Sequence, residues 1–580
     1  MFIVSALIAS SLLTADVSIE DVLPDNTIAF ATVTDVSELV THLQNMGLSD
    51  AICDIAQTVC GSQEITGDES CPIDASYFSE DGTITLPGGQ ASWGLYPVAD
   101  LESDTIGIGM LAFLQLEDEK LESLIKQGFE KHAKANEVEI ETVDISGRDV
   151  WMVQFNFDLP ADSLPMPINI DAPSNLYFAN TDGFLIFGTE PDGFDFFFSA
   201  IDDDPIEESL GSNSVYDALM TRCGTEGDVK AGVLLTNLAD TLLQMDASGM
   251  AMMMMPMAKT IFGDIDGIAE TVSFAPSQDV MLEGKYAILM ESGRSGLLGL
   301  ISEDATASSI PSFVSDDTIT YSQSSIAFDK VLPLMKEVLS SNPMIALQFN
   351  PQMMEQMEAG VSMYLSPLGS QMHFVTSGTE PYTDGSVGFM AAIECVDEEQ
   401  LSSVLSLMMP SVGAEPSDFL GNQIFTVDVS GGMMMPMDLS MSVAVAGGYV
   451  FLGSQHSVEN ALRSIAHPKE AKSTHGTNSA VSILGHENMS GWGYGDIAKS
   501  MMMQKAMNDS LLEMYDEQLS QIEEFDPEMA AEMRAEADMG MLKQDALYDA
   551  LMKCFGPMAW NLRADDTGLT AEVLMLQPTK

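Results

Sequence analysis

Two stretches of alternating apolar and polar residues predict a pair of matching strands in distant parts of the chain. Alternation places every second side chain on the same face of a strand. The first stretch begins at Ile106 and the second at Val387, and their apolar positions correspond one to one. These positions are Ile106, Ile108, Met110, Ala112 and Leu114 in the first stretch and Val387, Phe389, Ala391, Ile393 and Cys395 in the second.

Each predicted strand is followed by a segment with helical spacing. Residues 116–125 (LEDEKLESLI) correspond to 396–405 (VDEEQLSSVL), so that Leu121 matches Leu401. Apolar residues recur at three- and four-residue steps, and acids stand in the first turn, where a helix favours negative charge. Because the helix match is shifted by one residue relative to the strand match, we expect an insertion or a bulge where strand meets helix.

Further matches follow in the same order along the chain. Their spacings drift, as tandem duplication followed by changes in loop length would produce. Helices are predicted at residues 34–43, 191–201 and 456–465, from apolar periodicity and from capping residues. The matched strand segments are 23–30 with 314–321, 145–153 with 419–427, 183–189 with 448–454, and 272–287 with 560–575.

These matches predict an α+β protein of two tandemly duplicated units. The units span residues 16–303 and 304–580, and each is expected to be an antiparallel sheet with helices packed on one face. A chain of 580 residues is long enough to divide into two such units. In an alternative arrangement, the two sheets join into one half-barrel or saddle with a groove between them.

The first residues indicate export. Residues 2–13 (FIVSALIASSLL) are a short apolar run followed by Thr14 and Ala15, which predicts a signal peptide over residues 1–15. No later apolar stretch is long enough for a membrane helix, so the mature chain is expected to have no integral membrane segment. Cys53, Cys60 and Cys71 lie close together in the sequence, which is compatible with an oxidising compartment.

The charge of the chain excludes one class of function. With 88 acidic and 22 basic side chains, the formal net charge is −66. Contacts to nucleic-acid phosphates need clustered Lys and Arg, so we expect no nucleic-acid partner. The charge also predicts repulsion from anionic membranes, and it favours a solvated acidic surface suited to saline surroundings.

One set of segments resembles a known kind of protein. Residues 23–30 (LPDNTIAF) and the strand–turn–helix pattern of 447–465 (GGYVFLGSQHSVENALRSI) resemble a family of exported bacterial proteins of unknown function. The resemblance implies tandem α+β units behind a signal peptide, in an envelope or secreted setting. It carries no catalytic residues with it.

The motifs of common active sites are absent from the sequence. The seven histidines form no HExxH pair, no CxxC occurs, and the GxSxG, GxGxxG and P-loop patterns are missing. We therefore predict no catalytic, cofactor-binding or metal site and no cofactor. The acidic clusters at residues 202–204 with 207–208, and Asp192 with Asp195, lack the spacing of a calcium loop and are expected to be solvated loops.

The chain has 43 methionines, concentrated at residues 252–255, 433–435 and 501–503. Copper binding by thioethers is one reading, but flexible apolar packing is the favoured one, with the first two runs in loops next to strands. If the methionines form an exposed patch, it is a candidate site for a peptide, a lipid or another apolar partner.

We therefore expect an exported, non-catalytic binding or scaffold protein of the cell envelope, with an unknown protein or apolar ligand as its partner. Two alternatives stay open. One is a carrier of lipid or another apolar ligand in a methionine-lined groove. The other is a hydrolase whose site is assembled from residues far apart in the sequence.

Overall fold

The computed structural model describes most of the chain. The described residues are 17–45, 89–100, 105–116, 140–154, 175–202, 206–245, 249–304, 306, 309–341, 351–383, 386–428, 440–468, 475–485, 488–523 and 552–578, with a few single positions between 525 and 548. The predicted signal peptide, the three crowded cysteines and nearly all of the helix predicted at 116–125 lie outside these residues.

In the described part of the chain, twenty strands form one sheet, and every pair of neighbouring strands is antiparallel. In the first part of the chain they are β1 (Ala29–Val33), β2 (Ala91–Asp100), β3 (Thr105–Gln115), β4 (Ile140–Ile145), β5 (Arg148–Gln154), β6 (Asn175–Thr181), β7 (Phe184–Gly188), β8 (Val229–Leu234), β9 (Gly267–Phe274) and β10 (Val280–Leu289). The others are β11 (Thr318–Ser325), β12 (Leu368–Gly378), β13 (Val387–Cys395), β14 (Glu415–Phe419), β15 (Asn422–Asp428), β16 (Ser440–Ala446), β17 (Tyr449–Ser454), β18 (Gly491–Asp496), β19 (Pro557–Asp565) and β20 (Gly568–Leu576).

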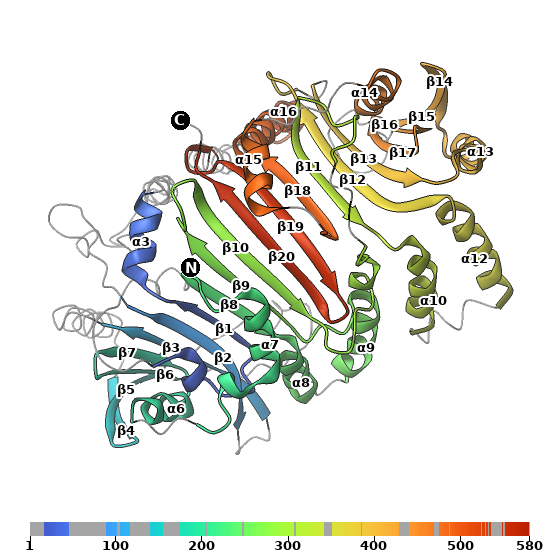
Figure 1. The fold of residues 1–580 in the computed structure, drawn as a ribbon. Helices are drawn as coiled ribbons and strands as arrows, with labels where there is room; N and C mark the ends of the chain where they lie inside the picture. The colour runs from blue at the N-terminus through green and yellow to red at the C-terminus, as the bar shows by residue number, and fades with distance from the viewer. Residues whose placement is uncertain are drawn as a thin grey trace.

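The two sets of ten strands have the same order in space. From one edge to the centre the order is β4-β5-β6-β7-β3-β2-β1-β8-β9-β10, and from the other edge it is β14-β15-β16-β17-β13-β12-β11-β18-β19-β20. The halves meet where β10 pairs with β20, along the middle of the sheet (Figure 1). The expected pair of separate sheets is therefore wrong, and the alternative of a joined sheet agrees with the structure.

Four tight hairpins repeat the same geometry in the two halves. The β4–β5 turn at Ser146 and Gly147 and the β14–β15 turn at Leu420 and Gly421 both have two residues with positive φ. The β6–β7 and β16–β17 turns share this conformation. Two-residue turns of this kind match the twist of the flanking strands. The predicted matches of 145–153 with 419–427 and of 183–189 with 448–454 agree with these strand pairings.

One predicted match needs a correction. Leu111 of β3 lies opposite Gly188, and Met390 of β13 lies opposite Gly453. The sequence pattern predicted that Leu111 corresponds to Ala392. Since Gly188 matches Gly453, Leu111 corresponds to Met390 instead. The shift of two positions leaves each side chain on the same face of its strand, because strand faces alternate with a period of two.

Helices and short 3₁₀ segments connect the strands. The α-helices are α2 (Ile19–Val22), α3 (Val36–Asn45), α6 (Pro191–Ile201), α7 (Ser214–Cys223), α8 (Leu235–Met245), α9 (Met250–Phe262), α10 (Val331–Ser341), α12 (Pro351–Leu365), α13 (Glu398–Met408), α14 (Gln455–Ala466), α15 (His475–Leu484) and α16 (Ile497–Glu523). The 3₁₀ segments are η3 (Leu210–Ser212), η4 (Leu298–Leu300), η5 (Phe328–Lys330) and η6 (Met409–Val412).

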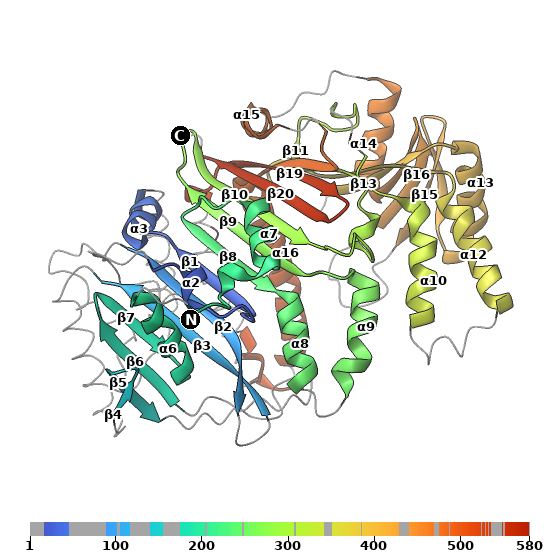
Figure 2. The ribbon, with the colours of Figure 1, turned by 60° about the horizontal axis from the view of Figure 1, so that its bottom comes forward.

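These helices cover both faces of the sheet, so the prediction of helices on one face is wrong. Phe30 packs edge-on against Tyr216 of α7, whereas Val33 belongs to a separate core with Leu39 of α3. Residues three apart in a strand point to opposite faces. Figure 2 shows the same division, with α7, α14 and α15 on one side of the sheet and α8, α9, α10 and α12 on the other.

Candidate functional site

Two acids of the predicted clusters, Asp202 and Asp195, form contacts within the protein. Arg148 donates two hydrogen bonds to Asp202, at 3.0 and 2.9 Å, and the bond from Arg148 lowers the pKa of this carboxyl group. Asp195 accepts a hydrogen bond from Ser146 at 2.5 Å. Among the described residues, no group of three or more His, Cys, Asp and Glu side chains could hold a metal ion. Asp203 and Asp204 lie outside the described residues.

The described histidines do not gather into a site. His42, His373 and His456 lie on α3, β12 and α14, His467 follows the end of α14, and His475 is the first residue of α15. His373 is 1% exposed, and its Nδ1 lies 3.0 Å from the hydroxyl of Tyr321. Burial lowers the pKa of His373 to about 4, so the ring is neutral near pH 7. Burial also raises the pKa of Tyr321, so its hydroxyl stays protonated near pH 7.

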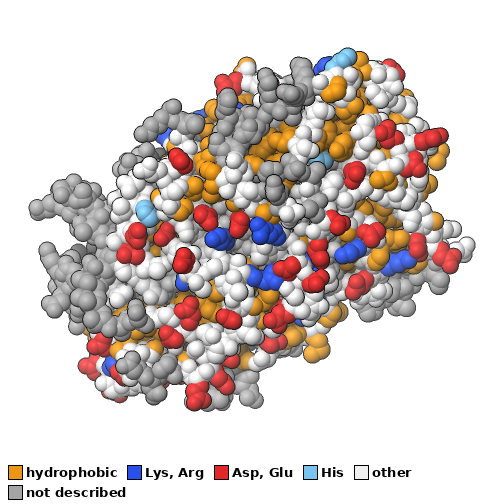
Figure 3. Space-filling view, in the orientation of Figure 1, with side chains coloured by type: hydrophobic (Ala, Val, Ile, Leu, Met, Phe, Trp, Pro, Cys, Tyr) orange, Lys and Arg blue, Asp and Glu red, His pale blue; other side chains and the backbone are white. Residues whose placement is uncertain are grey.

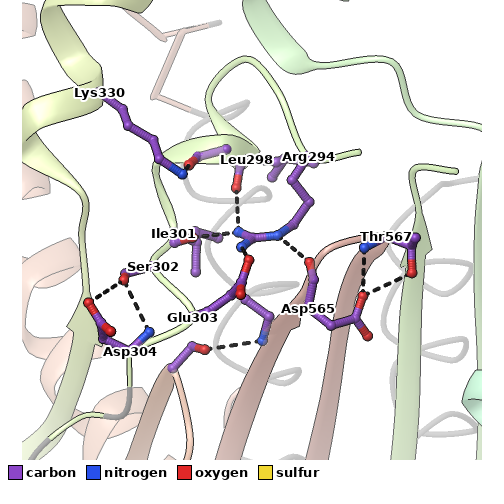
Figure 4. Close-up of polar contacts among 12 residues, drawn as sticks. Arg294, Leu298, Ile301, Ser302, Glu303, Asp304, Lys330, Asp565 and Thr567 are labelled. Carbon is purple, nitrogen blue, oxygen red and sulfur yellow. Dashed lines mark hydrogen bonds and ion pairs between the residues drawn. The ribbon is translucent and has the colours of Figure 1, made fainter. Parts of the chain in front are cut away.

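A cluster of polar contacts around Arg294 holds the chain where the two halves meet (Figure 4). The guanidinium group donates to the carbonyl oxygens of Leu298 and Ile301, at 3.3 Å for Leu298. It also donates to the carbonyl oxygen of Asp565 at 2.5 Å and forms a 2.8 Å ion pair with Glu303. The side chain of Arg294 is only 4% exposed. This one residue therefore connects the segment between β10 and β11 to the β19–β20 hairpin.

A second arginine reaches the same hairpin from the first half of the chain. Arg222 of α7 donates two hydrogen bonds to the carboxylate of Asp565, at 3.0 and 3.1 Å, and a third to Thr567. These bonds lower the pKa of Asp565, although its partial burial acts in the opposite direction. Most visible Lys and Arg side chains on this face lie in a band across its middle, between more widely spread acids (Figure 3).

Beside the Arg294 cluster lies a cavity of about 420 Å³, here called the junction pocket. Its walls combine serine hydroxyls, carboxylates at exposed positions, and apolar side chains from η5, α10 and α12. Ser302 donates to Asp304 at 3.0 Å, and Ser366 accepts from Gln400 at 3.1 Å. The lining residues are Ser302, Asp304, Ile326, Ala327, Phe328, Asp329, Leu332, Ser362, Leu365, Ser366, Leu368, Gly369 and Ser370.

The junction pocket combines charged, hydroxyl and apolar groups. Its described lining residues include no His, Cys or Lys, and the carboxylate that accepts a hydrogen bond from Ser302 is that of Asp304, with no histidine between them. Asp304 and Asp329 supply negative charge, while Phe328, Leu332 and Leu365 supply apolar surface. Such walls fit a ligand that carries hydroxyl or cationic groups together with an apolar part.

A smaller apolar cavity lies between α3 and the sheet. It measures about 170 Å³ and is walled by β1, β2, β3, β7 and β8, with Leu39 of α3 at its side. Trp93, Phe113 and Phe187 are its largest side chains. A volume of this size can hold a short apolar group. Among the described residues that line this cavity and the junction pocket, none is a methionine.

The first methionine run does not lie in a loop, as the sequence predicted. Residues 252–255 belong to helix α9, and Met252, Met253 and Met254 are exposed rather than packed in a core. Residues 501–503 lie in α16, and 433–435 lie outside the described residues. The expectation of loop-bound packing is thus wrong for 252–255, whereas an exposed apolar patch is present.

Sequence reasoning did not identify Arg294 or the junction pocket. One available signal was the scarcity of basic residues. With 22 basic and 88 acidic side chains, each basic side chain can find an acidic partner. Another was the pair of glycines around Arg294, since Gly293 and Gly296 both have positive φ. A side chain at Gly296 would also collide with the backbone of Gly263.

Comparison with known proteins adds no relative to this description. No protein-family model, no curated protein and no solved structure matches the chain. The resemblance to a family of exported proteins thus stays a prediction.

Within the described residues, no helix combines the length and the apolar character needed to cross a membrane.

Proposed function

We propose that the chain is an exported, non-catalytic binding or scaffold protein of the cell envelope, and that the junction pocket is its ligand site. The observation that carries this proposal is the wall of the pocket, where carboxylates and hydroxyls face apolar side chains and no His, Cys or Lys stands among the described lining residues. The short apolar run at residues 2–13 supports export.

We also propose that the two halves arose by tandem duplication. The equal strand order of the halves and the equal pairing of their hairpins support this origin. A fused pair of sheets gives a long rigid platform, and the segment between the halves becomes a natural place for a site that neither half has alone. The junction pocket draws its residues from this segment and from the first elements of the second half.

A carrier of a small apolar ligand is the second candidate. The cavity beside α3 favours it, because its walls are almost entirely apolar. Its volume of about 170 Å³ is below the usual range of about 300–1,000 Å³ for ligand pockets, so a complete lipid would not fit inside it.

The proposal is tested by blocking the mouth of the junction pocket. Ser362 is exposed on α12 and lines the pocket, so Ser362→Trp would fill the entrance without disturbing a core. Ser402→Trp, at an exposed position of α13, is the matched control. Purified full-length protein is heated with spermidine, with a set of hexoses and with short alkylamines.

We expect at least one of these probes to raise the melting temperature of the wild type and of Ser402→Trp, but not of Ser362→Trp. Equal stabilisation of all three proteins would place the ligand elsewhere. Saturable turnover of nitrophenyl esters, phosphates or glycosides by the wild type would contradict the non-catalytic function.

A further inference from the structure

Four helices project from one face of the sheet, away from the covered core. Figure 2 shows α8, α9, α10 and α12 as a row of roughly parallel helices below the sheet. In this row α8 contacts α9, α9 contacts α10, and α10 contacts α12. The row joins the last helices before β9 in the first half to the helices after β11 in the second.

The free end of this row is apolar and exposed. Met252 and Met253 are 72% and 73% exposed, and Met254 is 50% exposed. Leu243 of α8 and Met353 of α12 are exposed as well. These five residues, which we call the methionine patch, lie near the ends of α8, α9 and α12 that are farthest from the sheet. Single exposed apolar residues are ordinary, but Met252, Met253 and Met254 follow one another on one projecting helix, and α8, which carries Leu243, contacts that helix. Several exposed apolar side chains gathered in this way mark a contact surface.

Acids border the methionine patch, and the cations of the row are already engaged. Lys259 pairs with Asp264 at 2.6 Å, and Lys336 pairs with Glu358 at 2.6 Å. Asp240 stands one turn from Leu243 on α8, and Glu355 is a further acid of α12, on a different side of that helix from Met353; both side chains are exposed. In the described part of these four helices, the charge that is left over is negative.

We propose that the methionine patch is a docking surface for a basic, amphipathic segment of another polypeptide. Flexible methionine side chains adapt to apolar side chains of different shapes, which suits a helix laid on them by its apolar face. The exposed acid Asp240 and the net negative charge of the chain then attract the Lys and Arg residues that flank such an apolar face. This surface is separate from the junction pocket, so the two proposals stand or fall independently.

The charges decide between this partner and two others. A second copy of the chain would bring another −66 charges and the same acidic border to the contact. An anionic lipid surface would repel the protein for the same reason. A basic polypeptide gains from both the apolar contact and the charge, and its association would be accelerated by the field of the acidic protein.

The test uses purified full-length protein and three fluorescent peptides of equal length. One is an amphipathic helix of Leu and Lys, one has the same residues in scrambled order, and one has Glu in place of Lys. The patch variant is Met252→Gln/Met253→Gln/Met254→Gln, which changes no charge and keeps good helix formers. The control variant is Leu407→Gln, at another exposed apolar position, on α13. Circular dichroism verifies that both variants are folded.

We expect the amphipathic Leu/Lys peptide to bind the wild type and Leu407→Gln equally, and to bind the patch variant about tenfold or more weakly. The scrambled and acidic peptides should bind no variant at the same concentration. Equal binding of the scrambled peptide would show that charge alone acts, and equal affinity of the patch variant would place the contact elsewhere; either result overturns the proposal. Sedimentation with phosphatidylcholine vesicles that needs the three methionines, without peptide binding, would reassign the patch to a lipid surface.

Discussion

Lys285 on β10 lies directly opposite Glu572 on β20, at the pairing that joins the two halves of the sheet. Lys285 also pairs with Glu283 at 3.2 Å, and Glu572 accepts a hydrogen bond from Asn561 at 3.1 Å. In the described sheet, β10 and β20 form the only strand pairing between the halves. Near the middle of this pairing, Lys285 lies between Glu283 and Glu572.

Reversing this charge should weaken the pairing modestly. Lys285→Glu places three carboxylates close together, and we expect the free energy of unfolding to fall by about 0.5–1 kcal/mol, because the site is partly exposed. Urea denaturation of the full chain measures this change. The double variant Lys285→Glu/Glu572→Lys should recover part of the loss. No recovery would show that the two side chains do not interact.

Arg294 should matter much more, because it is buried and has several acceptors. In Arg294→Met, the carbonyl oxygens of Ile301 and Asp565 lose their donor and Glu303 loses its partner, so we expect a loss of about 3–5 kcal/mol. Arg294→Lys should also destabilise, since one ammonium group cannot reproduce the planar fork. Urea denaturation is the measurement. The control is Arg534→Met, which removes a more exposed pair with Glu523. An equal effect of the two Met variants would contradict the assigned role of Arg294.

His373 should make the protein less stable in mild acid. The pKa of His373 is lowered to about 4 in the folded state, against about 6.5 in an unfolded chain. The unfolded chain therefore takes up a proton first, so this contribution to stability is complete above pH 6.5 and is lost as the pH falls toward 4.

The neutral variant His373→Gln isolates this effect. Between pH 6.5 and 5, the wild type should lose up to about 1.4 kcal/mol per pH unit more than the variant. Chemical denaturation at several pH values measures the difference. The carboxyl groups with lowered pKa values, such as Asp202 and Asp565, titrate at lower pH and do not enter this window. Parallel pH profiles of the two proteins would show that His373 is not buried as a neutral ring.

Salt should stabilise the protein. With a formal charge of −66, repulsion acts across about 30 Å in 0.01 M salt but across only about 3 Å in 1 M salt. We expect the melting temperature to rise with added NaCl. Calcium should add no more than magnesium at equal ionic strength, because Asp202 is already bonded to Arg148. A flat response to NaCl would contradict the repulsion, and a large calcium-specific rise would indicate a cation site.

Local parts of this fold could be predicted from the sequence. The helix at Pro191–Ile201 has the predicted bounds, and the strands around the Gly147 and Gly421 turns lie where the pattern placed them. Asp35 caps α3 through the amide of Glu38, close to the expected start of that helix. In each case the signal is carried by a few neighbouring residues, such as a turn glycine, a capping carboxylate or an alternating strand.

The joined sheet and the junction pocket could not be predicted in the same way. β10 and β20 pair although they belong to opposite halves of the chain. No local feature of either strand indicates which strand it pairs with. The pocket collects residues from Ser302 to Ser370 that share no motif. Helices on both faces were also missed, because periodicity shows which side of a helix is apolar but not which face of a sheet it covers.

The junction pocket and the Arg294 cluster exist only if the two halves form one sheet. Hydrogen–deuterium exchange of the full-length protein tests this most directly, resolved to single amides in β10, β20 and the edge strands β4 and β14. In a continuous sheet, successive amides along both β10 and β20 should be protected, whereas β4 and β14 should be protected at alternate amides. Protection of only alternate amides along β10 and β20 would mean that both are edge strands, and it would contradict the joined sheet.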